Sequence, residues 1–148
     1  MEIVGQMVTS FIATGAFGIL FNAPKKTLIK CGLIGMGGWV LYYILEDFTN
    51  NAVLATLAAT IFIAVLSQQL AKFYKTPVII FSVAGIIPLV PGGMAYDAMR
   101  NFVENDYNAA IALAAKVLML AGVIAFGLVF SEVINQVTKK LSTRPNKV

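Results

Sequence analysis

The sequence of 148 residues has no histidine, a single cysteine and few charges, which make up 12% of it. Histidine is the commonest metal ligand and the usual proton carrier near neutral pH, so a histidine-based metal site or catalytic triad is excluded. Cys31 has no second cysteine to pair with and is interpreted as a small packing residue. We therefore expect no metal and no cofactor.

Long apolar runs take the place of the missing charges. Hydrophobic residues form 59% of the chain and its mean hydropathy is +0.83, whereas a soluble globular chain is typically about 45–50% apolar and about 25% charged. The apolar residues come in blocks that no water-soluble core of this size could hide, so they need a hydrocarbon solvent. The sequence predicts one integral membrane unit embedded in the lipid bilayer.

The net charge of +4 does not indicate a nucleic-acid binder. The basic residues lie in short clusters between apolar blocks, as membrane anchors do, so we expect no nucleic acid among the partners. Nor does the N-terminus resemble a cleaved signal peptide, because Glu2 stands where a basic segment belongs and no basic residue precedes Lys25. The first block is expected to be retained as a membrane span.

Five blocks approach the roughly 20 residues that a membrane-spanning helix needs. We predict an all-α fold, a polytopic membrane helix bundle over residues 1–137, followed by a basic cytoplasmic tail over 138–148. The expected spans are 3–21, 31–45, 53–71, 78–99 and 109–131.

The fourth block is expected to be a discontinuous helix. Its apolar part, 78–90, would reach only about 20 Å, less than the roughly 30 Å of the hydrocarbon core. Pro88 and Pro91 lack backbone donors, and the glycine pair at 92–93 permits backbone angles that other residues resist. We expect a break near 88–93 and a crossing in two pieces rather than a segment that dips in and returns.

Basic and acidic loops alternate along the chain, and this sets the predicted orientation. Because cytoplasmic loops attract Lys and Arg, the first and third loops and the tail should lie inside. The N-terminus should then lie outside and the C-terminus in the cytoplasm, which requires an odd number of crossings. The basic residues are Lys25, Lys26, Lys30, Lys72, Lys75, Lys139, Lys140, Arg144 and Lys147, and the acidic loops carry Glu46, Asp47, Asp97, Glu104 and Asp106, with Arg100 as their one cation.

A break at membrane depth is tolerated only where it faces protein or a water-lined cavity. In transporters such broken helices form substrate and ion sites, where a helix N-terminus favours an anion and freed carbonyls favour a cation. The alternative is a proline kink or a re-entrant turn with no ligand. The spacing P-x-x-P-G-G is denser than a kink needs, so we favour a substrate-binding or pathway role for Gly85, Pro88, Pro91, Gly92, Gly93 and Tyr96.

Three charged residues are further candidates. A charge at the depth of Lys116 usually faces the bundle interior or water. Lys116 therefore binds an anionic carboxylate or pairs with Asp97 or Glu132, or else it snorkels to the surface. Asp97 and Glu132 are candidates for ion coupling, although a solvated acid is the simpler interpretation of each. The polar run at 67–69 either lines a pathway or, as we favour, joins helices by hydrogen bonds.

Small residues within the blocks are expected to let helices pack closely. The glycine-rich run 32–38 has no strand before it, so it is not a dinucleotide-binding loop. The pairs Ala55/Ala59 and Ala121/Ala125 are interpreted in the same way as packing positions.

The run Gly85-x-x-Pro88-x-x-Pro91-Gly92, with Tyr96 beyond it on a short five-span chain, resembles the small, C-terminal-type component of the threonine/serine exporter family. The resemblance covers the chain up to Val137. It implies export of small polar metabolites, either amino acids such as threonine and serine or dicarboxylates such as succinate, driven by the proton motive force. It also implies a multi-pass protein of the bacterial inner membrane and a separately encoded partner, the larger membrane subunit of the same exporter family.

Other functions stay open at this point. The runner-up is a non-transporting structural or assembly subunit of a membrane complex, in which the broken helix would be an interface. A homo-oligomer that forms a complete carrier is a further arrangement. An enzyme is disfavoured, because no pair of acids and no activated nucleophile converge at one depth, and a channel lacks rings of charge.

Overall fold

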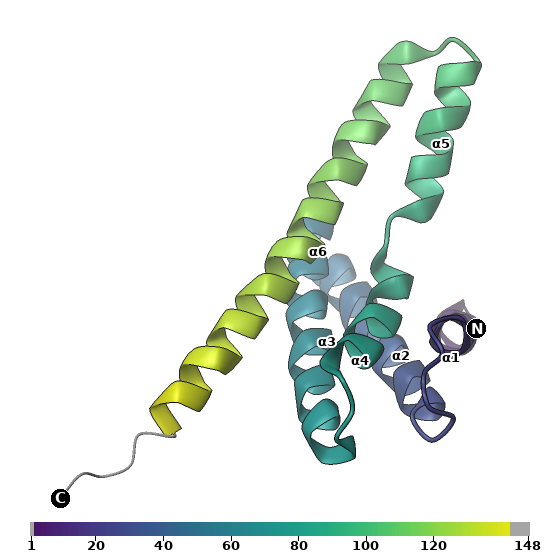
Figure 1. Cartoon of the computed structure of the whole chain (residues 1–148). Helices are drawn as coiled ribbons and strands as arrows, with labels where there is room; N and C mark the ends of the chain where they lie inside the picture. Colours follow the sequence, from purple (N-terminus) through teal and green to yellow (C-terminus); the bar gives the residue numbers. More distant parts are fainter. Residues whose placement is uncertain (1, 143–148) are drawn as a thin grey trace, which may run out of the picture.

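The computed structural model describes residues 2–142, and every regular element within that range is helical (Figure 1). Four helices are long and apolar enough to cross a membrane, which confirms the predicted all-α membrane fold. They are α1 (Glu2–Leu20), α2 (Leu28–Thr49), α3 (Ala52–Tyr74) and α6 (Tyr107–Ser142). Between α3 and α6 lie α4 (Val78–Ile86), the short 3-10 helix η1 (Ile87–Leu89) and α5 (Gly92–Val103).

The fourth segment is broken where the prolines predict. α4 and α5 are bent by 52° from one another across η1, and together they are apolar enough for a fifth, bent span or for a re-entrant loop. The role expected of the glycines is not found, since no glycine in the described range has a positive φ. Gly92 and Gly93 begin α5, and a Cβ on either would meet nothing within 4 Å. The prolines alone therefore account for the break.

Three long helices, α2, α3 and α6, extend beyond the apolar blocks that predicted them, α2 and α6 by the most. Lys30 and the acids at 46–47 lie inside α2 rather than beside it. α6 continues through 138–142, so the first part of the expected tail is helical, and the remainder, 143–148, lies outside the described residues. Lys and Glu are good helix formers, so a charge marks the edge of the apolar region rather than the end of the helix.

Glycines on α2 bring three helices close together. A Cβ on Gly35 would overlap the side chain of Thr14 on α1, and Gly32 meets α1 in the same way. On another side of α2, a Cβ on Gly38 would overlap the side chain of Ile63 on α3. Small residues thus bring helices into close contact here, as the sequence predicted.

α3 is the central helix and packs against α2, α4 and α6. Its Ala55 and Ala59 are buried, as expected for packing positions. Ala121 and Ala125 of α6 are exposed instead, because no helix in the described range covers that face of α6. The close packing expected of this second pair is therefore not made within the chain.

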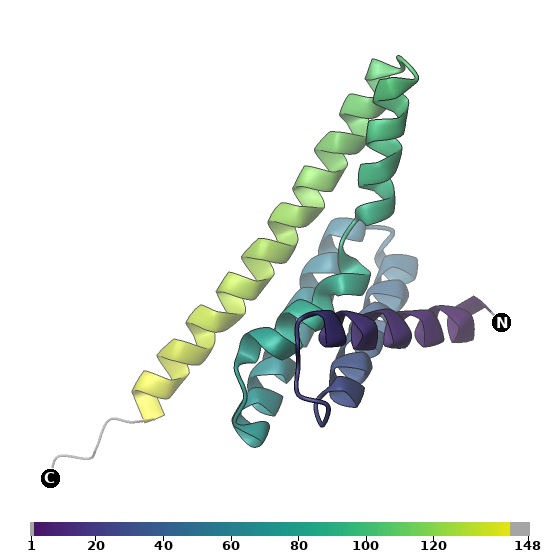
Figure 2. The ribbon, with the colours of Figure 1, turned by 45° about the vertical axis from the view of Figure 1, so that its right-hand side comes forward.

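The first half of α6 forms a hairpin with α5 that extends beyond the rest of the bundle (Figures 1 and 2). Helix α1 is seen nearly end-on in Figure 1 and lies crosswise in Figure 2, so it crosses its neighbours steeply.

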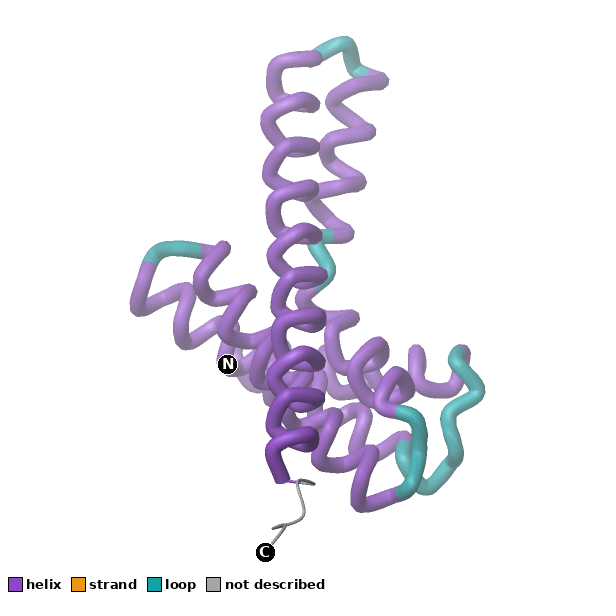
Figure 3. Tube along the Cα trace, turned by 60° about the vertical axis from the view of Figure 1, so that its left-hand side comes forward, coloured by secondary structure: helices purple, strands orange, loops and turns teal. Residues whose placement is uncertain are grey.

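The basic segments gather at one end of the bundle. Lys30 Nζ lies 5.0 Å from the ring centroid of Tyr74, which joins the start of α2 to the end of α3. Lys72 Nζ donates a 3.1 Å hydrogen bond to Asn135 Oδ1, which joins the end of α3 to the second half of α6. Figure 3 shows the α1–α2 and α3–α4 loops close together and far from the α5–α6 loop. Segments that the charge pattern assigned to one side of the membrane do lie side by side.

Candidate functional site

The break in the fourth segment satisfies its own backbone. Proline at 88 and 91 cannot donate to the carbonyls of Ala84 and Ile87. The N–H of Ile87 donates to Ala84 O instead, and the N–H of Val90 donates to Ile87 O. These two carbonyls are therefore paired, and the polar groups beside the break come from neighbouring helices.

Those neighbours are α1 and α2, which flank η1. Pro88 lines a groove of about 240 Å³ together with Gln6, Thr9 and Ser10 of α1 and Trp39 of α2. The spacing of the three α1 residues places them on one helix face. A polar stripe of α1 is thus turned toward the proline at the break.

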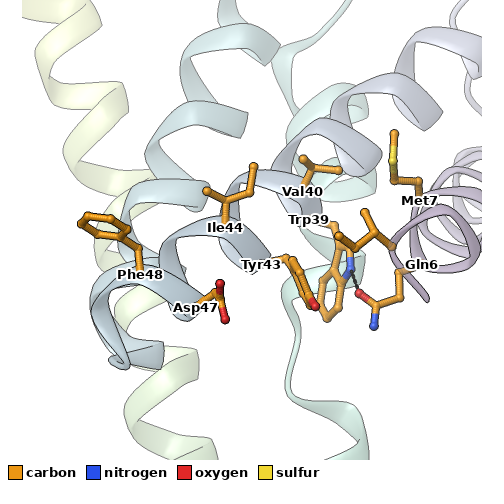
Figure 4. A pocket seen from close by; sticks show the side chains of 9 residues that line it. Gln6, Met7, Trp39, Val40, Tyr43, Ile44, Asp47 and Phe48 are labelled. Carbon is orange, nitrogen blue, oxygen red and sulfur yellow. Dashed lines mark hydrogen bonds between the residues drawn. The ribbon is translucent and has the colours of Figure 1, made fainter. Parts of the chain in front are cut away.

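A second groove, of about 280 Å³, adjoins the first (Figure 4). The two share Gln6 and Trp39, and the indole Nε1 of Trp39 donates a 3.2 Å hydrogen bond to Gln6 Oε1. Tyr43 and Asp47 of α2 also line the second groove, among apolar side chains. We call the two together the α1–α2 groove, which leads from the break toward an acidic residue.

The α1–α2 groove has the makeup of a site for a small polar molecule. Such sites have mostly apolar walls with a few polar groups that fix orientation. The amide N–H of Gln6 and the hydroxyl of Ser10 offer donors and an acceptor, while the indole N–H of Trp39 already donates to Gln6 Oε1 and orients that amide. Ser10 is 7% exposed, and its hydroxyl forms no hydrogen bond with any described residue.

Among the site residues predicted from the sequence, Gly85 is buried where α4 packs closely against other helices. A Cβ on Gly85 would lie 2.8 Å from Ile34 Cγ2 of α2 and 2.8 Å from Ile63 Cγ2 of α3. It lets α4 approach both helices and does not line the α1–α2 groove.

The rest of the predicted motif lies beyond the break. Gly92, Gly93 and Asp97 are exposed on α5, and Tyr96 is 69% exposed. Pro91 precedes α5, and neither it nor these four residues line the α1–α2 groove. Pro88 is the one motif residue that the structure brings into that groove.

Lys116 is exposed in the half of α6 that extends with α5. It forms no ion pair with any residue that the structure describes, so neither of the pairings expected with Asp97 and Glu132 is present. Glu132 follows sixteen positions later in the same helix, about 24 Å along its axis.

Glu132 is instead held by two amides. Gln68 Nε2 of α3 donates to Glu132 Oε2 at 3.3 Å, and Gln136 Nε2 donates to Glu132 Oε1 at 3.1 Å. Gln68 Nε2 also reaches Ser131 Oγ at 3.4 Å. This confirms, for Gln68, the expectation that the polar run at 67–69 joins helices by hydrogen bonds.

The same residues line a further groove of about 330 Å³ between α3, α4 and α6. Its polar members are Gln68, Glu132 and Ser82, and the other lining residues are apolar. We call it the α3–α4–α6 groove. Ser82 was not a sequence candidate, and neither were Gln6 and Ser10. The feature of the sequence that could have identified these three residues is that each is a polar residue within an apolar membrane helix.

Comparison with known families matches residues 6–134 to the family described as "Threonine/Serine exporter, ThrE". This chain belongs to the threonine/serine exporter family. The family is one of exporters rather than enzymes. Together with the apolar helices, membership of this family makes the chain a multi-pass membrane protein of an exporter family.

A relative in Haemophilus influenzae named "Uncharacterized protein" is 30% identical to this family member over 136 residues. The match covers 86% of this chain and 46% of the relative, so the chain spans about half the length of that curated relative. No solved structure matches the chain. The range shared with the threonine/serine exporter family, 6–134, takes in Gln6, Pro88 and Glu132 and every lining residue of both grooves except Ile3.

Proposed function

We propose that this chain is the smaller subunit of a two-component exporter in the bacterial inner membrane. The solutes are small polar metabolites, either amino acids of the threonine and serine type or dicarboxylates such as succinate, and the proton motive force drives their export. The second component is a larger membrane subunit of the same family, encoded separately.

The observation that carries the proposal is the polar groove at the broken helix. Pro88 interrupts the fourth segment at the place where Gln6 and Ser10 of α1 and Trp39 of α2 turn polar groups toward it. Discontinuous helices in transporters carry solute sites at such breaks, and access alternates as one bundle of helices rocks against another around the site. The α1–α2 groove would hold the solute while this chain and its partner subunit move relative to one another.

The need for a second component is supported by surfaces that this chain leaves uncovered. Ala121 and Ala125 of α6 are exposed small residues, which allow close approach of a further helix. A relative twice as long contains sequence that this chain does not match. In the proposed exporter, helices of the larger subunit cover this face of α6.

The test is efflux of labelled threonine, serine and succinate from cells that lack their own exporters. The chain is expressed alone and together with the larger family member encoded next to it. Efflux only with both proteins is the expected result, and the exported compound identifies the solute. Efflux with this chain alone would replace the two-component arrangement by a homo-oligomer. No efflux of any of the three, with both proteins shown in one membrane complex, would favour the structural or assembly subunit.

A further inference from the structure

Two contacts between α3 and α6, at the basic end of the bundle, lie one helical turn apart, and each involves a charged side chain. Gln68 and Lys72 share one face of α3, and Glu132 and Asn135 share the facing side of α6. Gln68 contacts Glu132, and Lys72 contacts Asn135. No ion pair joins Lys72 to Glu132 in the described part of the chain.

Each of these charges is held by amides instead of by the other. Glu132 accepts from Gln68 and Gln136, and Lys72 donates to Asn135 Oδ1 at 3.1 Å. Amide hydrogen bonds orient a charge without neutralising it. Both charged side chains are exposed, so the described part of the chain leaves room for a ligand beside them.

The α3–α4–α6 groove begins at this place and gives room for a side chain. It holds about 330 Å³ and presents Ser82 and the amide of Gln68 among apolar walls. Gln68 is 7% exposed, and its Oε1 accepts no hydrogen bond from any described residue. An amide oxygen that has no partner can accept a hydrogen bond from a ligand hydroxyl.

We propose that this place is the cytoplasmic entry site for a zwitterionic hydroxy amino acid. Glu132 binds the ammonium group, Lys72 binds the carboxylate, and Gln68 and Ser82 receive the hydroxylated side chain in the groove. An α-amino acid carries both charges on one carbon. It can therefore bridge groups that lie about one turn, or roughly 5 Å, apart through two charge-assisted hydrogen bonds of about 2.8 Å.

The same geometry disfavours a dicarboxylate. Its second carboxylate would face Glu132, and like charges at such short range repel. The inference thus rests on the proposed export function and narrows its two solute classes to amino acids. It also places α4, the first piece of the broken helix, in contact with the solute through Ser82.

The test measures equilibrium binding of three ligands to the purified full chain, alone and with the larger subunit. The ligands are L-threonine, L-threonine amide, which lacks the carboxylate charge, and 3-hydroxybutyrate, which lacks the ammonium group. Wild-type protein should bind threonine at least about tenfold more tightly than either analogue, as expected for the loss of one charged hydrogen bond.

Two variants then test which protein side chain binds the ammonium group of threonine and which binds its carboxylate. Glu132→Gln keeps an oxygen for Gln68 and should weaken threonine binding about tenfold while leaving 3-hydroxybutyrate unaffected. Lys72→Gln should weaken the binding of threonine by a similar factor and leave the binding of L-threonine amide unaffected. Glu104→Gln and Lys75→Gln, an acid and a base outside this place, serve as matched controls and should bind all three ligands as wild type does.

The inference is overturned if wild-type protein binds no threonine, or if both variants bind every ligand as wild type does. It is also overturned if each variant weakens all three ligands alike, which is the pattern of a structural defect. Because Lys72 is exposed, its variant keeps the test valid even if Glu132→Gln does not fold. Efflux without this charge dependence of binding would support the exporter function and refute the proposed site. Charge-dependent binding without efflux would support the site and refute the exporter function.

Discussion

The indole Nε1 of Trp39 donates a 3.2 Å hydrogen bond to Gln6 Oε1 and so fastens α2 to α1 where the two parts of the α1–α2 groove meet. This bond orients the Gln6 amide, whose Nε2 donates to no described residue and can face a solute. It therefore links the packing of α1 to the chemistry of the groove.

We predict that Trp39→Phe lowers the free energy of unfolding by about 1 kcal/mol, because a partly buried hydrogen bond is lost while most of the ring packing is kept. Unfolding in detergent micelles measures the change. Gln6→Leu should cost a similar amount, and the double variant little more than one of the two, with a coupling energy of about 1 kcal/mol. Additive losses would show that the two side chains do not interact.

Gly85 and Gly92 belong to the same motif, yet the structure gives them different surroundings. Gly85→Ala should lower the free energy of unfolding by about 1–3 kcal/mol, because the added Cβ would press against Ile34 and Ile63. Gly92→Ala should leave it unchanged or raise it by up to about 1 kcal/mol, since alanine fits the helix and meets no neighbour. A loss at Gly92 equal to that at Gly85 would refute this assignment.

Lys116→Ala should impair transport more than folding. Lys116 is exposed and unpaired in the described range, so its removal should change the free energy of unfolding by less than about 0.5 kcal/mol. A charge at this depth of a membrane helix is retained for a polar contact with solute, partner or water. Efflux should fall, and Lys116→Arg should restore it. Normal efflux from a well-expressed Lys116→Ala variant would refute the prediction that transport needs this charge.

Orientation is predicted from the clustering of the basic loops. In a Cys31→Ala background, cysteine at position 26 should react with an impermeant thiol reagent only after the cells are opened. Cysteine at positions 48 and 104 should react from outside. Protection at 104 with reaction at 48 would make the fourth segment re-entrant, and the reverse pattern at all three would invert the topology.

The break in the fourth segment could be predicted from the sequence, because the effect of a proline on a helix is local. Pro88 and Pro91 forbid the regular helix bonds whatever surrounds them, so the break was predictable. The glycine pair at 92–93 was expected to help to break the helix, yet neither glycine has a positive φ and both lie in the first turn of α5. Glycine permits that conformation but does not require it.

The polar neighbours of the break could not be found in this way. Gln6 and Ser10 lie about eighty residues before Pro88, and their place beside it depends on how the glycines of α2 pack α1. Glu132 was named as a candidate, but its partner Gln68 comes from another helix, so only the fold brings them together. Residue type identified the candidates, and helix packing decided which of them meet.

The central claim, that solute passes along the α1–α2 groove at the break, is tested most directly by thiol labelling of Ser10→Cys. The background is Cys31→Ala, the larger subunit is present, and the reagent is small and water-soluble. We predict that the cysteine is labelled and that the exported solute slows its labelling. Ile12→Cys, an exposed position in the middle of the same helix and outside the groove, should stay unlabelled, because lipid keeps the water-soluble reagent away from it. A cysteine at position 10 that is not labelled, or whose labelling no exported solute slows, would contradict the account.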